Sequence, residues 1–277
     1  MTLTPHDASG AALSNAPLAF LDIESTGLSP GEGHRVCEVA LLRVRGETVE
    51  ARYNMLVNPL RPMNEQAAAV HGITPELLEG APHFHQIAPH LLALLDGTVI
   101  VAHNAPFDVA FLNGEFERGG LPPLANPVLD TLVLARRLLR RPSHSLRALA
   151  KEFQLPAPTH RAMSDVLALQ GLFAHLAALL GELGIATLHD ALRFQRGLLP
   201  GQPELPPPPL IAQALQQGRK LHIIYRSLSS PEPTERVIRP IEVTQERSGA
   251  YLRAYCYLRN DLRSFALEKI DFIELVD

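Results

Sequence analysis

Three apolar runs near the start of the chain predict β-strands at residues 18–24, 35–44 and 49–57. They are rich in β-branched residues and are separated by glycine-containing turns, which is the pattern of paired strands. Connections this short join antiparallel neighbours, because parallel strands need a longer crossover. We therefore expect an antiparallel meander.

Further along the chain, helical and strand patterns alternate. The longest helix is expected at 163–180, where Val166, Leu169 and Phe173 follow the helical period of about 3.6 residues. Shorter helices are expected at 84–95, 105–118, 132–140 and 146–153, and strands at 98–102 and 128–129. Alternating elements of this kind predict an α/β domain with a mixed sheet.

Residues 200–209 hold six prolines and interrupt this pattern. Proline at that density cannot continue a helix or a central strand and favours an extended, semi-rigid chain. We interpret the segment as a linker between a first domain, residues 1–199, and a second domain, residues 210–277. Strand-like runs at 220–226, 236–240, 251–259 and 263–265 predict that the second domain is all-β.

The composition is that of a globular protein. Of 277 residues, 46% are hydrophobic and 19% are charged, and the formal net charge is −4. The net charge therefore gives no sign of the strongly basic face that is typical of nucleic-acid binders. The chain has no run of about 18 uninterrupted apolar residues, no secretion signal, and only two distant cysteines, Cys37 and Cys256. These features predict a cytoplasmic protein without a membrane partner.

Asp22 and Glu24 form an acidic pair in the first predicted strand, within the string Asp-Ile-Glu-Ser-Thr-Gly at 22–27. Residues two apart on a strand project from the same face, so the two carboxylates lie side by side. Two such carboxylates repel unless a cation or protons neutralise them. Taken alone, the pair could also be a solvated strand end.

Two further strings place acids beside the ends of other elements. His-Asn-Ala-Pro-Phe-Asp at 103–108 follows a predicted strand, with Asn104 as N-cap and Asp108 in the first helical turn. His-Arg-Ala-Met-Ser-Asp at 160–165 leads into the longest helix, with His160 ahead of it and Asp165 near its start. Taken separately, Asp108 could serve the helix dipole and His160 could be a surface residue.

Together the three strings supply four carboxylates, Asp22, Glu24, Asp108 and Asp165, and one imidazole, His160. Four converging acids need a cation, and oxygen ligands suit Mg²⁺ or Mn²⁺. Two such ions can stabilise the attacking and leaving oxygens of a phosphoryl displacement, while a histidine takes the proton of the attacking water. The set predicts metal-dependent phosphodiester hydrolysis.

In order and spacing, the strings resemble the three motifs of the DEDDh branch of the DnaQ-like exonuclease superfamily, over about residues 16–180. Asn58-Pro59, the string Val-His-Gly-Ile-Thr at 70–74 and Leu129-Asp130-Thr131 are similar to the bacterial proofreading type. The resemblance implies a ribonuclease H-like α/β fold and a 3′-5′ exonuclease that acts on DNA in proofreading or repair. Nothing in the sequence identifies a polymerase partner or an oligomeric state.

The resemblance also implies roles for single residues. Asp22, Glu24 and Asp165 match the ligands of one metal ion; Asp22 also reaches a second ion, and Asp108 contributes through water. His160 matches the general base. The terminal nucleotide is expected to contact Thr26, Leu28, His103, Asn104 and Phe107.

The second domain resembles a WYL domain, a small SH3/Sm-like β-barrel, over nearly all of residues 215–277. Ala250 stands at the tryptophan position of the Trp-Tyr-Leu triplet, ahead of Tyr251 and Leu252, so the aromatic platform is reduced. Interleaved tyrosines and arginines can stack on bases and neutralise phosphates, or the tyrosines can pack the core and the arginines face solvent. The candidate nucleic-acid contacts are Tyr225, Arg226, Tyr251, Arg253 and Arg263.

A basic cluster lies between the second and third motifs on helical patterns. Its members are Arg136, Arg137, Arg140, Arg141 and Arg147. The cluster is either a solvated face or a phosphate contact beside the active site. We favour a DNA exonuclease over an RNA exonuclease that uses the same five catalytic residues. A non-catalytic regulator that binds nucleic acid is the third hypothesis, and the intact acidic set argues against it.

Overall fold

The computed structural model describes residues 11–204, 206–227, 232–246 and 248–276, and it divides into two compact units, Met1–Gln195 and Arg196–Asp277. Each unit has its own sheet and its own core. The proline-rich segment expected to be a linker belongs to the second unit, and helix α8 (Pro209–Gln217) begins at its last residue. Proline is tolerated at the first helical position, where the missing N–H would have no helical partner.

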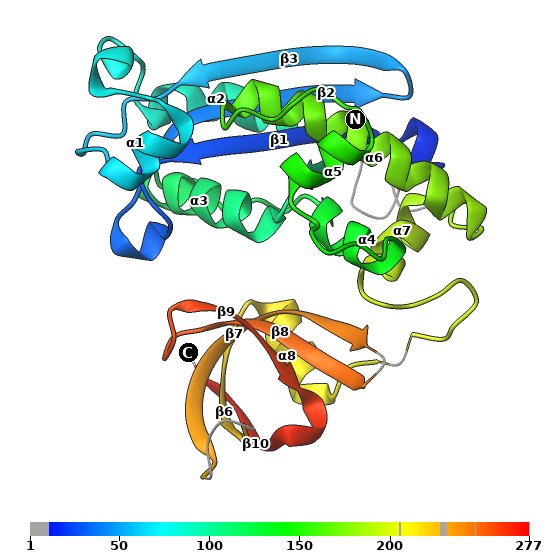
Figure 1. Ribbon diagram of the computed structural model, residues 1–277. Helices are drawn as coiled ribbons and strands as arrows, with labels where there is room; N and C mark the ends of the chain where they lie inside the picture. The colour runs from blue at the N-terminus through cyan, green and yellow to red at the C-terminus, as the bar shows by residue number, and fades with distance from the viewer. Residues whose placement is uncertain (1–10, 205, 228–231, 247, 277) are drawn as a thin grey trace. The chain divides into compact units, whose positions relative to one another are not determined.

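The first unit is built on a five-stranded mixed sheet of order β3-β2-β1-β4-β5 (Figure 1). Its strands are β1 (Pro17–Ser25), β2 (Val36–Arg45), β3 (Thr48–Leu56), β4 (Val99–Ala102) and β5 (Val128–Asp130). β1, β2 and β3 pair antiparallel, whereas β4 pairs parallel with both β1 and β5. The predicted meander and mixed sheet are thereby confirmed.

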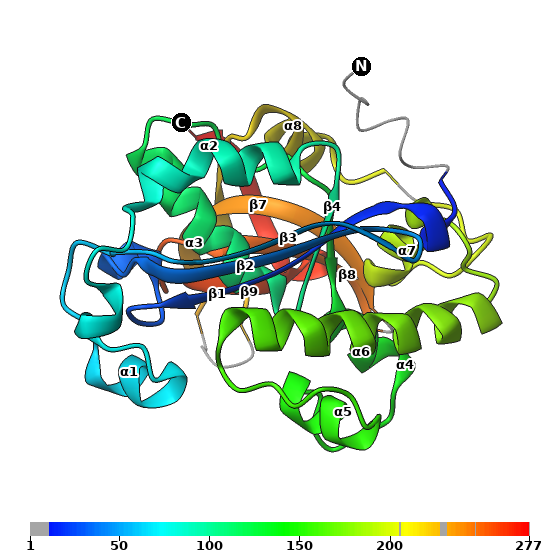
Figure 2. The same cartoon turned by 90° about the horizontal axis from the view of Figure 1, so that it is seen from above.

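Helices cover both faces of this sheet, and Figure 2 shows α2 and α6 on opposite sides. The helices are α1 (Glu65–His71), α2 (Phe84–Leu95), α3 (Ala105–Arg118), α4 (Thr131–Leu138), α5 (Leu146–Glu152), α6 (Ala162–Glu182) and α7 (Leu188–Gln195). Leu18 and Phe20 of β1 pack in the core under α6, whereas Leu21 and Ile23 pack in the core under α2 and α3. Because side chains alternate along a strand, Asp22 lies on the α6 side of the sheet.

Three helices were not predicted from the sequence. α1, α7 and α8 have 7, 8 and 9 residues, a length at which the helical period is a weak signal that reveals some helices, such as α4 and α5, and misses others. α1 is instead defined by its ends, because the Asn64 side chain accepts a hydrogen bond from the Gln66 N–H and Gly72 follows with a φ of 68°. Such caps fix a short helix that apolar periodicity does not reveal.

Helix α6 is long and apolar enough to cross a membrane by length and composition alone. Half of its most apolar window is buried inside the unit, and the helix packs against β1, β2, α4 and α5. These contacts make α6 the core helix of the first unit. Its first turn carries Asp165, so the central packing of the helix also positions a candidate ligand.

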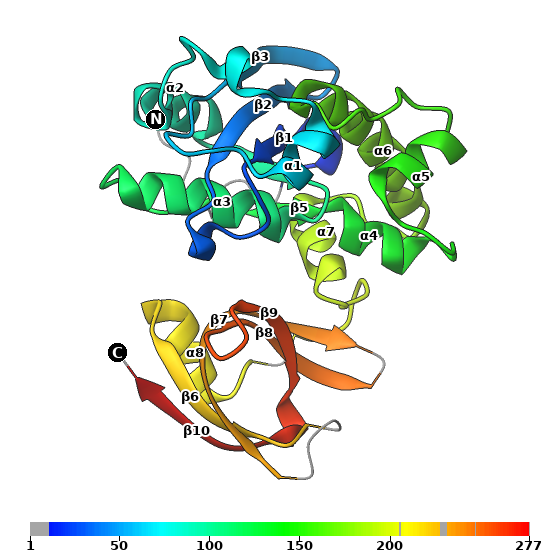
Figure 3. The same ribbon diagram turned by 60° about the vertical axis from the view of Figure 1, so that its left-hand side comes forward.

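The second unit is an all-antiparallel five-stranded sheet of order β10-β6-β7-β8-β9 with α8 packed on it (Figure 3). The strands are β6 (Lys220–Tyr225), β7 (Thr234–Glu246), β8 (Gly249–Cys256), β9 (Asp261–Ala266) and β10 (Ile270–Val276). β10 was not predicted, and β7 continues beyond the predicted end at Pro240. The pairing of β7 with β8 shifts between Pro240 and Glu242, and such a bulge is where a sheet accommodates proline.

Candidate active site

The acidic pair lies near the end of the central strand β1. Asp22 stands opposite Ala40 and Glu24 opposite Glu38 in the antiparallel register with β2. Both side chains of the pair are partly exposed, although their neighbours Leu21 and Ile23 are buried. The period of two therefore places both carboxylates on one face, as the sequence predicted.

Asp108 joins this pair from the first turn of α3. Its side chain is buried, and its Oδ1 accepts a hydrogen bond of 3.2 Å from the N–H of Ile23, the residue between Asp22 and Glu24. The start of α3 is therefore bonded to the middle of the acidic string.

Asn104 stands at the N-cap position of α3, but its side chain does not make the predicted capping bond. The residue has a left-handed backbone, with φ at 69° and ψ at 46°. Its N–H donates to Oδ1 of Asp130 at 3.0 Å, and the same oxygen accepts from the Leu132 N–H at 2.9 Å. Asp130 thus fixes the turn after β4 and caps α4 at once.

The third string brings Asp165 and His160 to the same place. Asp165 is buried in the first turn of α6, and its Oδ1 accepts from the N–H groups of Thr159 at 2.9 Å and His160 at 3.1 Å. His160 has a φ of 57°, and its side chain is exposed. The Asp165 carboxylate therefore fixes the backbone of the residues before α6, and the imidazole of His160 is left exposed to solvent.

An ion pair between a partly exposed arginine, Arg161, and a buried glutamate, Glu38, was missed by the sequence analysis. Arg161 donates from Nε and from a terminal nitrogen to the two oxygens of Glu38, each at 3.0 Å, and Ala162 N–H donates to Glu38 at 3.1 Å. The Glu38 side chain is 1% exposed. The pair ties the segment that carries His160 to β2, at the position opposite Glu24.

The pKa of each of the four candidate ligands is raised, and for Asp22, Glu24 and Asp108 neighbouring carboxylates contribute to the rise. Burial raises the pKa of Asp22, and the charges of Asp108, Glu24 and Asp165 raise it further. Burial, with Asp165 and Glu38, raises the pKa of Glu24 to about 8. Burial also raises the pKa of Asp108 and of Asp165, although backbone hydrogen bonds to their carboxylates oppose this. The structure thus brings together the acids that the sequence singled out.

This set of donors fits a divalent cation that prefers oxygen. Four mutually repelling carboxylates are stabilised when a cation replaces the protons that burial favours. Among the residues that the structure describes, no three acidic, histidine or cysteine side chains stand close enough to hold an ion as they are. Rotation of the carboxylates about their side-chain bonds would therefore accompany binding.

The metal-free protein should lose stability as the pH rises from about 5 to about 8. The pKa of Glu24 is about 8 in the folded protein, against 4.5 for an ordinary glutamate, so the folded state binds more protons in this range. Protonation favours folding below the ordinary value, and the advantage disappears as the pH rises through the folded value. Melting temperatures in EDTA should fall over this range, and Mn²⁺ should raise them more at the upper end.

Two variants sharpen this measurement. Glu24→Gln removes one of the acids whose pKa is raised and should reduce the pH dependence in EDTA, whereas Glu117→Gln changes an exposed acid on α3 and should leave it unchanged. If Mn²⁺ raised the melting temperature by the same amount at about pH 5 and at about pH 8, the mutual repulsion of the acids would be contradicted.

Two of the expected nucleotide contacts use their side chains within the protein. Thr26 is buried, and its Oγ1 accepts a bond of 3.0 Å from the Arg35 N–H. His103 donates from Nε2 to the backbone oxygen of His144 at 2.9 Å, while its Nδ1 lies 2.9 Å from Oγ1 of Thr131. Burial lowers the pKa of His103, which favours the neutral imidazole. Any contact of Thr26 or His103 with a nucleotide would therefore be made by the backbone of these residues.

The other expected contacts are accessible. Leu28 is 85% exposed, Asn104 is exposed, and the half-buried ring of Phe107 lies 4.8 Å from that of Phe111. Gly27 precedes Leu28 and is packed against the ring of His34, which any Cβ at this position would meet. A side chain at this position would have to displace the His34 ring, and the following residue, Leu28, is presented to solvent.

In the second unit, two of the candidate contacts take part in internal packing. The ring of Tyr225 lies edge-on to that of Phe265, with 5.0 Å between centroids, and its hydroxyl accepts from the Ala266 N–H. Arg253 pairs with Glu242 at 2.6 Å. These contacts favour the interpretation of Tyr225 as a packing residue.

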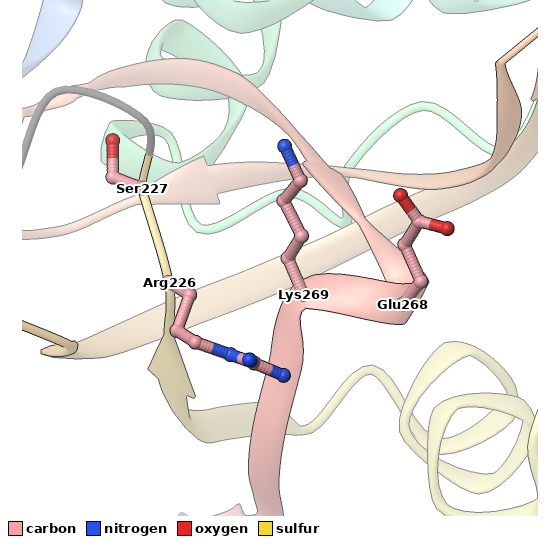
Figure 4. Close-up of a pocket in the computed structure, with 4 residues that line it drawn as sticks. All are labelled: Arg226, Ser227, Glu268 and Lys269. Carbon is pink, nitrogen blue, oxygen red and sulfur yellow. The ribbon is translucent and has the colours of Figure 1, made fainter.

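The remaining candidates have polar neighbours at the surface. Arg226 pairs with Asp271 at 2.7 Å, Arg263 with Asp261 at 3.3 Å, and the Tyr251 hydroxyl lies 2.8 Å from Oγ of Ser248. Arg226 also lines a pocket with Ser227, Glu268 and Lys269, which carries charges of both signs (Figure 4).

Tyr255 and Tyr257 form a second aromatic site that the candidate set left out. Their rings lie 5.2 Å apart, with Arg239 6.0 Å from the Tyr255 ring and Lys220 5.8 Å from the Tyr257 ring. The five contacts named from the sequence stay predictions, and this site is a further place where cations and aromatic rings meet.

Two family models match the chain. The model described as Exonuclease (RNase_T) matches residues 19–173, which contain all five candidate catalytic residues. The model described as WYL domain matches residues 209–275 and begins at the first residue of α8. The second compact unit is therefore a WYL domain with a leading helix.

Curated relatives are similar over the first unit. The DNA polymerase III subunit epsilon of Rickettsia conorii is 35% identical over 166 residues, which is 57% of this chain and 72% of that protein. The PolC-type DNA polymerase III of Thermotoga petrophila is 30% identical over 181 residues, or 65% of this chain, but the chain spans only 13% of that relative. A zinc-bound complex of Escherichia coli ExoI with single-stranded DNA shares the fold, with a TM-score of 0.57 and 18% identity over 87% of this chain and 54% of that chain.

Proposed function

Since the chain belongs to the Exonuclease (RNase_T) family, we propose that its first domain, residues 1–199, is a 3′-5′ exonuclease that hydrolyses DNA. Enzymes of this family depend on divalent metal ions. The observation that carries the proposal is the convergence of four carboxylates from β1, α3 and α6 beside an exposed histidine. Similarity to polymerase III epsilon subunits supports DNA as the substrate and a role in proofreading or repair.

Each residue of the site has a proposed task. Asp22, Glu24, Asp108 and Asp165 would hold two divalent ions, for which we propose Mg²⁺ or Mn²⁺. When bound, such ions stabilise the attacking and leaving oxygens of a phosphodiester. His160 takes the proton of the attacking water, because it is exposed and held next to Asp165 by its own backbone.

The surroundings of the acids would orient the substrate. Leu28, Asn104 and Phe107 are accessible next to the acidic site, and we propose that they hold the terminal nucleotide. The WYL domain would bind or sense a single strand, through the contacts named from its sequence or through the Tyr255 and Tyr257 site. We place the protein in the cytoplasm.

A single set of digestions tests the proposal. Single-stranded DNA, duplex DNA and RNA, each labelled at the 3′ or the 5′ end, are incubated with Mg²⁺ or Mn²⁺ and sampled over time. We expect loss of the 3′ label as mononucleotide and stepwise shortening of 5′-labelled DNA, with neither reaction in EDTA. Faster shortening of RNA would favour the RNA exonuclease, and no shortening of any substrate would contradict the proposal.

A further inference from the structure

Positive charge is concentrated between the second and third motifs, in residues 131–160, which we call the basic segment. It contains six basic residues and one acidic residue, Glu152, in a chain whose formal net charge is −4. The segment holds α4, α5 and the loops around them. Although the whole chain has a negative net charge, this part of the first unit therefore has a positive one.

The basic segment is attached to the candidate active site at its two ends. At its start, Asp130 accepts from the N–H groups of Leu132 in α4 and Asn104 beside α3. At its end, Thr159 N–H and His160 N–H donate to Asp165.

A third attachment holds the middle of the segment. His103 Nε2 donates to the oxygen of His144, in the loop between α4 and α5, at 2.9 Å. His144 in turn donates from Nε2 to the oxygen of Leu139 at 3.1 Å, which closes the loop that carries Arg140 and Arg141. Figures 1 and 2 show α4 and α5 beside α6, so the segment is continuous with the acidic site.

Three arginines of the segment are exposed and lack any acidic partner among the residues that the structure describes. Arg136 is on α4, Arg140 follows α4 and Arg147 is on α5. The charge of Arg136 reaches His103, whose pKa it helps to lower. Two other members serve the fold, since Arg141 pairs with Glu152 at 2.6 Å and Arg137 donates to the Gln195 oxygen at 3.0 Å.

We propose that Arg136, Arg140 and Arg147 bind the phosphate backbone of the single strand whose 3′ end lies in the acidic site. The inference rests on the proposed function and names the path of its substrate. Guanidinium groups match phosphate geometry, and exposed arginines without acidic partners are free to release counterions to a polyanion.

The salt dependence of binding tests this path. Binding of fluorescent oligo-dT, protected by phosphorothioate linkages at both ends, is measured by anisotropy in Mg²⁺ between about 50 and about 200 mM salt. For a single strand, each phosphate contact makes the slope of log affinity against log salt more negative by about 0.7, so the triple variant R136Q/R140Q/R147Q should reduce the magnitude of the slope by about 2. R136K/R140K/R147K should keep the parent slope.

A control variant that loses the same number of positive charges elsewhere distinguishes loss of these phosphate contacts from a change in net charge. R43Q/R45Q/R52Q removes three positive charges from the edge strand β3 and its neighbour β2, at the other end of the sheet from β5, and should leave the slope unchanged. A fall of less than about 0.7 in the first variant, the contribution of one contact, would overturn the inference, as would an equal fall in this control.

The binding slopes, taken together with the digestions of labelled DNA, distinguish this inference from the proposed function. If the unchanged protein binds with the expected slopes but hydrolyses no strand, the exonuclease proposal is wrong, whereas the proposed path of the strand is retained. A parent that hydrolyses DNA while the first variant keeps its slope would reject the path alone.

Discussion

Replacing Asp165 by asparagine should reduce DNA hydrolysis by at least about a thousandfold, because stabilisation by bound metal is worth several kcal/mol in the transition state. Asparagine keeps an oxygen at the Oδ1 position, so it can still accept from the N–H groups of Thr159 and His160. The substitution therefore removes charge while it preserves the bonds that shape the approach to α6. Single-turnover digestion of 3′-labelled DNA in Mg²⁺ and Mn²⁺ measures the loss.

The folding of this variant can be checked independently of its activity. Burial raises the pKa of Asp165, so its charged form is a cost to the metal-free protein at neutral pH. The metal-free variant should therefore melt at or above the temperature of the parent near pH 8, while Mn²⁺ should stabilise it less. Glu117→Gln, an exposed change on α3, should keep full activity. Activity of Asp165→Asn within about tenfold of the parent would rule out Asp165 as a metal ligand.

The position of Asp22 and Glu24 could be predicted because it depends on local geometry. A period of two on one strand places both on one face, whereas the structure was needed to show that this is the α6 side of the sheet. The meander follows from short connections. These features need only residues that are close in sequence.

Other parts of the site depend on contacts between distant residues. Glu38 and Arg161 are 123 residues apart, and the sequence shows only a strand residue and an arginine near a helix. Similarly, nothing near His103 in the sequence shows that its ring is bonded to Thr131 and His144. Buried polar pairs across a domain are products of the complete fold, so local patterns do not reveal them.

Glu115 illustrates the same limit within a helix. Its spacing to Glu117 repeats that of Asp22 and Glu24, but a helix separates the two side chains, leaving Glu115 buried and Glu117 exposed. Arg35 binds both oxygens of Glu115, at 2.6 and 2.7 Å, and so fixes the start of β2 against α3. The helical spacing predicts that the two acids diverge, but not which partner the buried one binds.

Replacing His160 by asparagine should slow hydrolysis by about 10²- to 10⁴-fold, the usual contribution of a general base. Asparagine is the appropriate replacement because, like histidine, it tolerates the left-handed backbone that the φ of 57° requires. The N–H of residue 160 can still bond to Asp165, and the Arg161–Glu38 pair still holds the segment on β2. The variant therefore tests the imidazole and not the fold of the loop.

The pH dependence of the rate distinguishes a general base from a residue that only contacts DNA. If His160 accepts the proton of water in the transition state, the variant should lose kcat with little change in KM, and the pH profile of its rate should differ from that of the parent. His85→Asn, a change at an exposed histidine on α2, should retain both the rate and the profile of the parent. A His160→Asn enzyme whose KM rises while kcat and its pH profile persist would make His160 a substrate contact. The proton of the attacking water would then have to pass to a different acceptor.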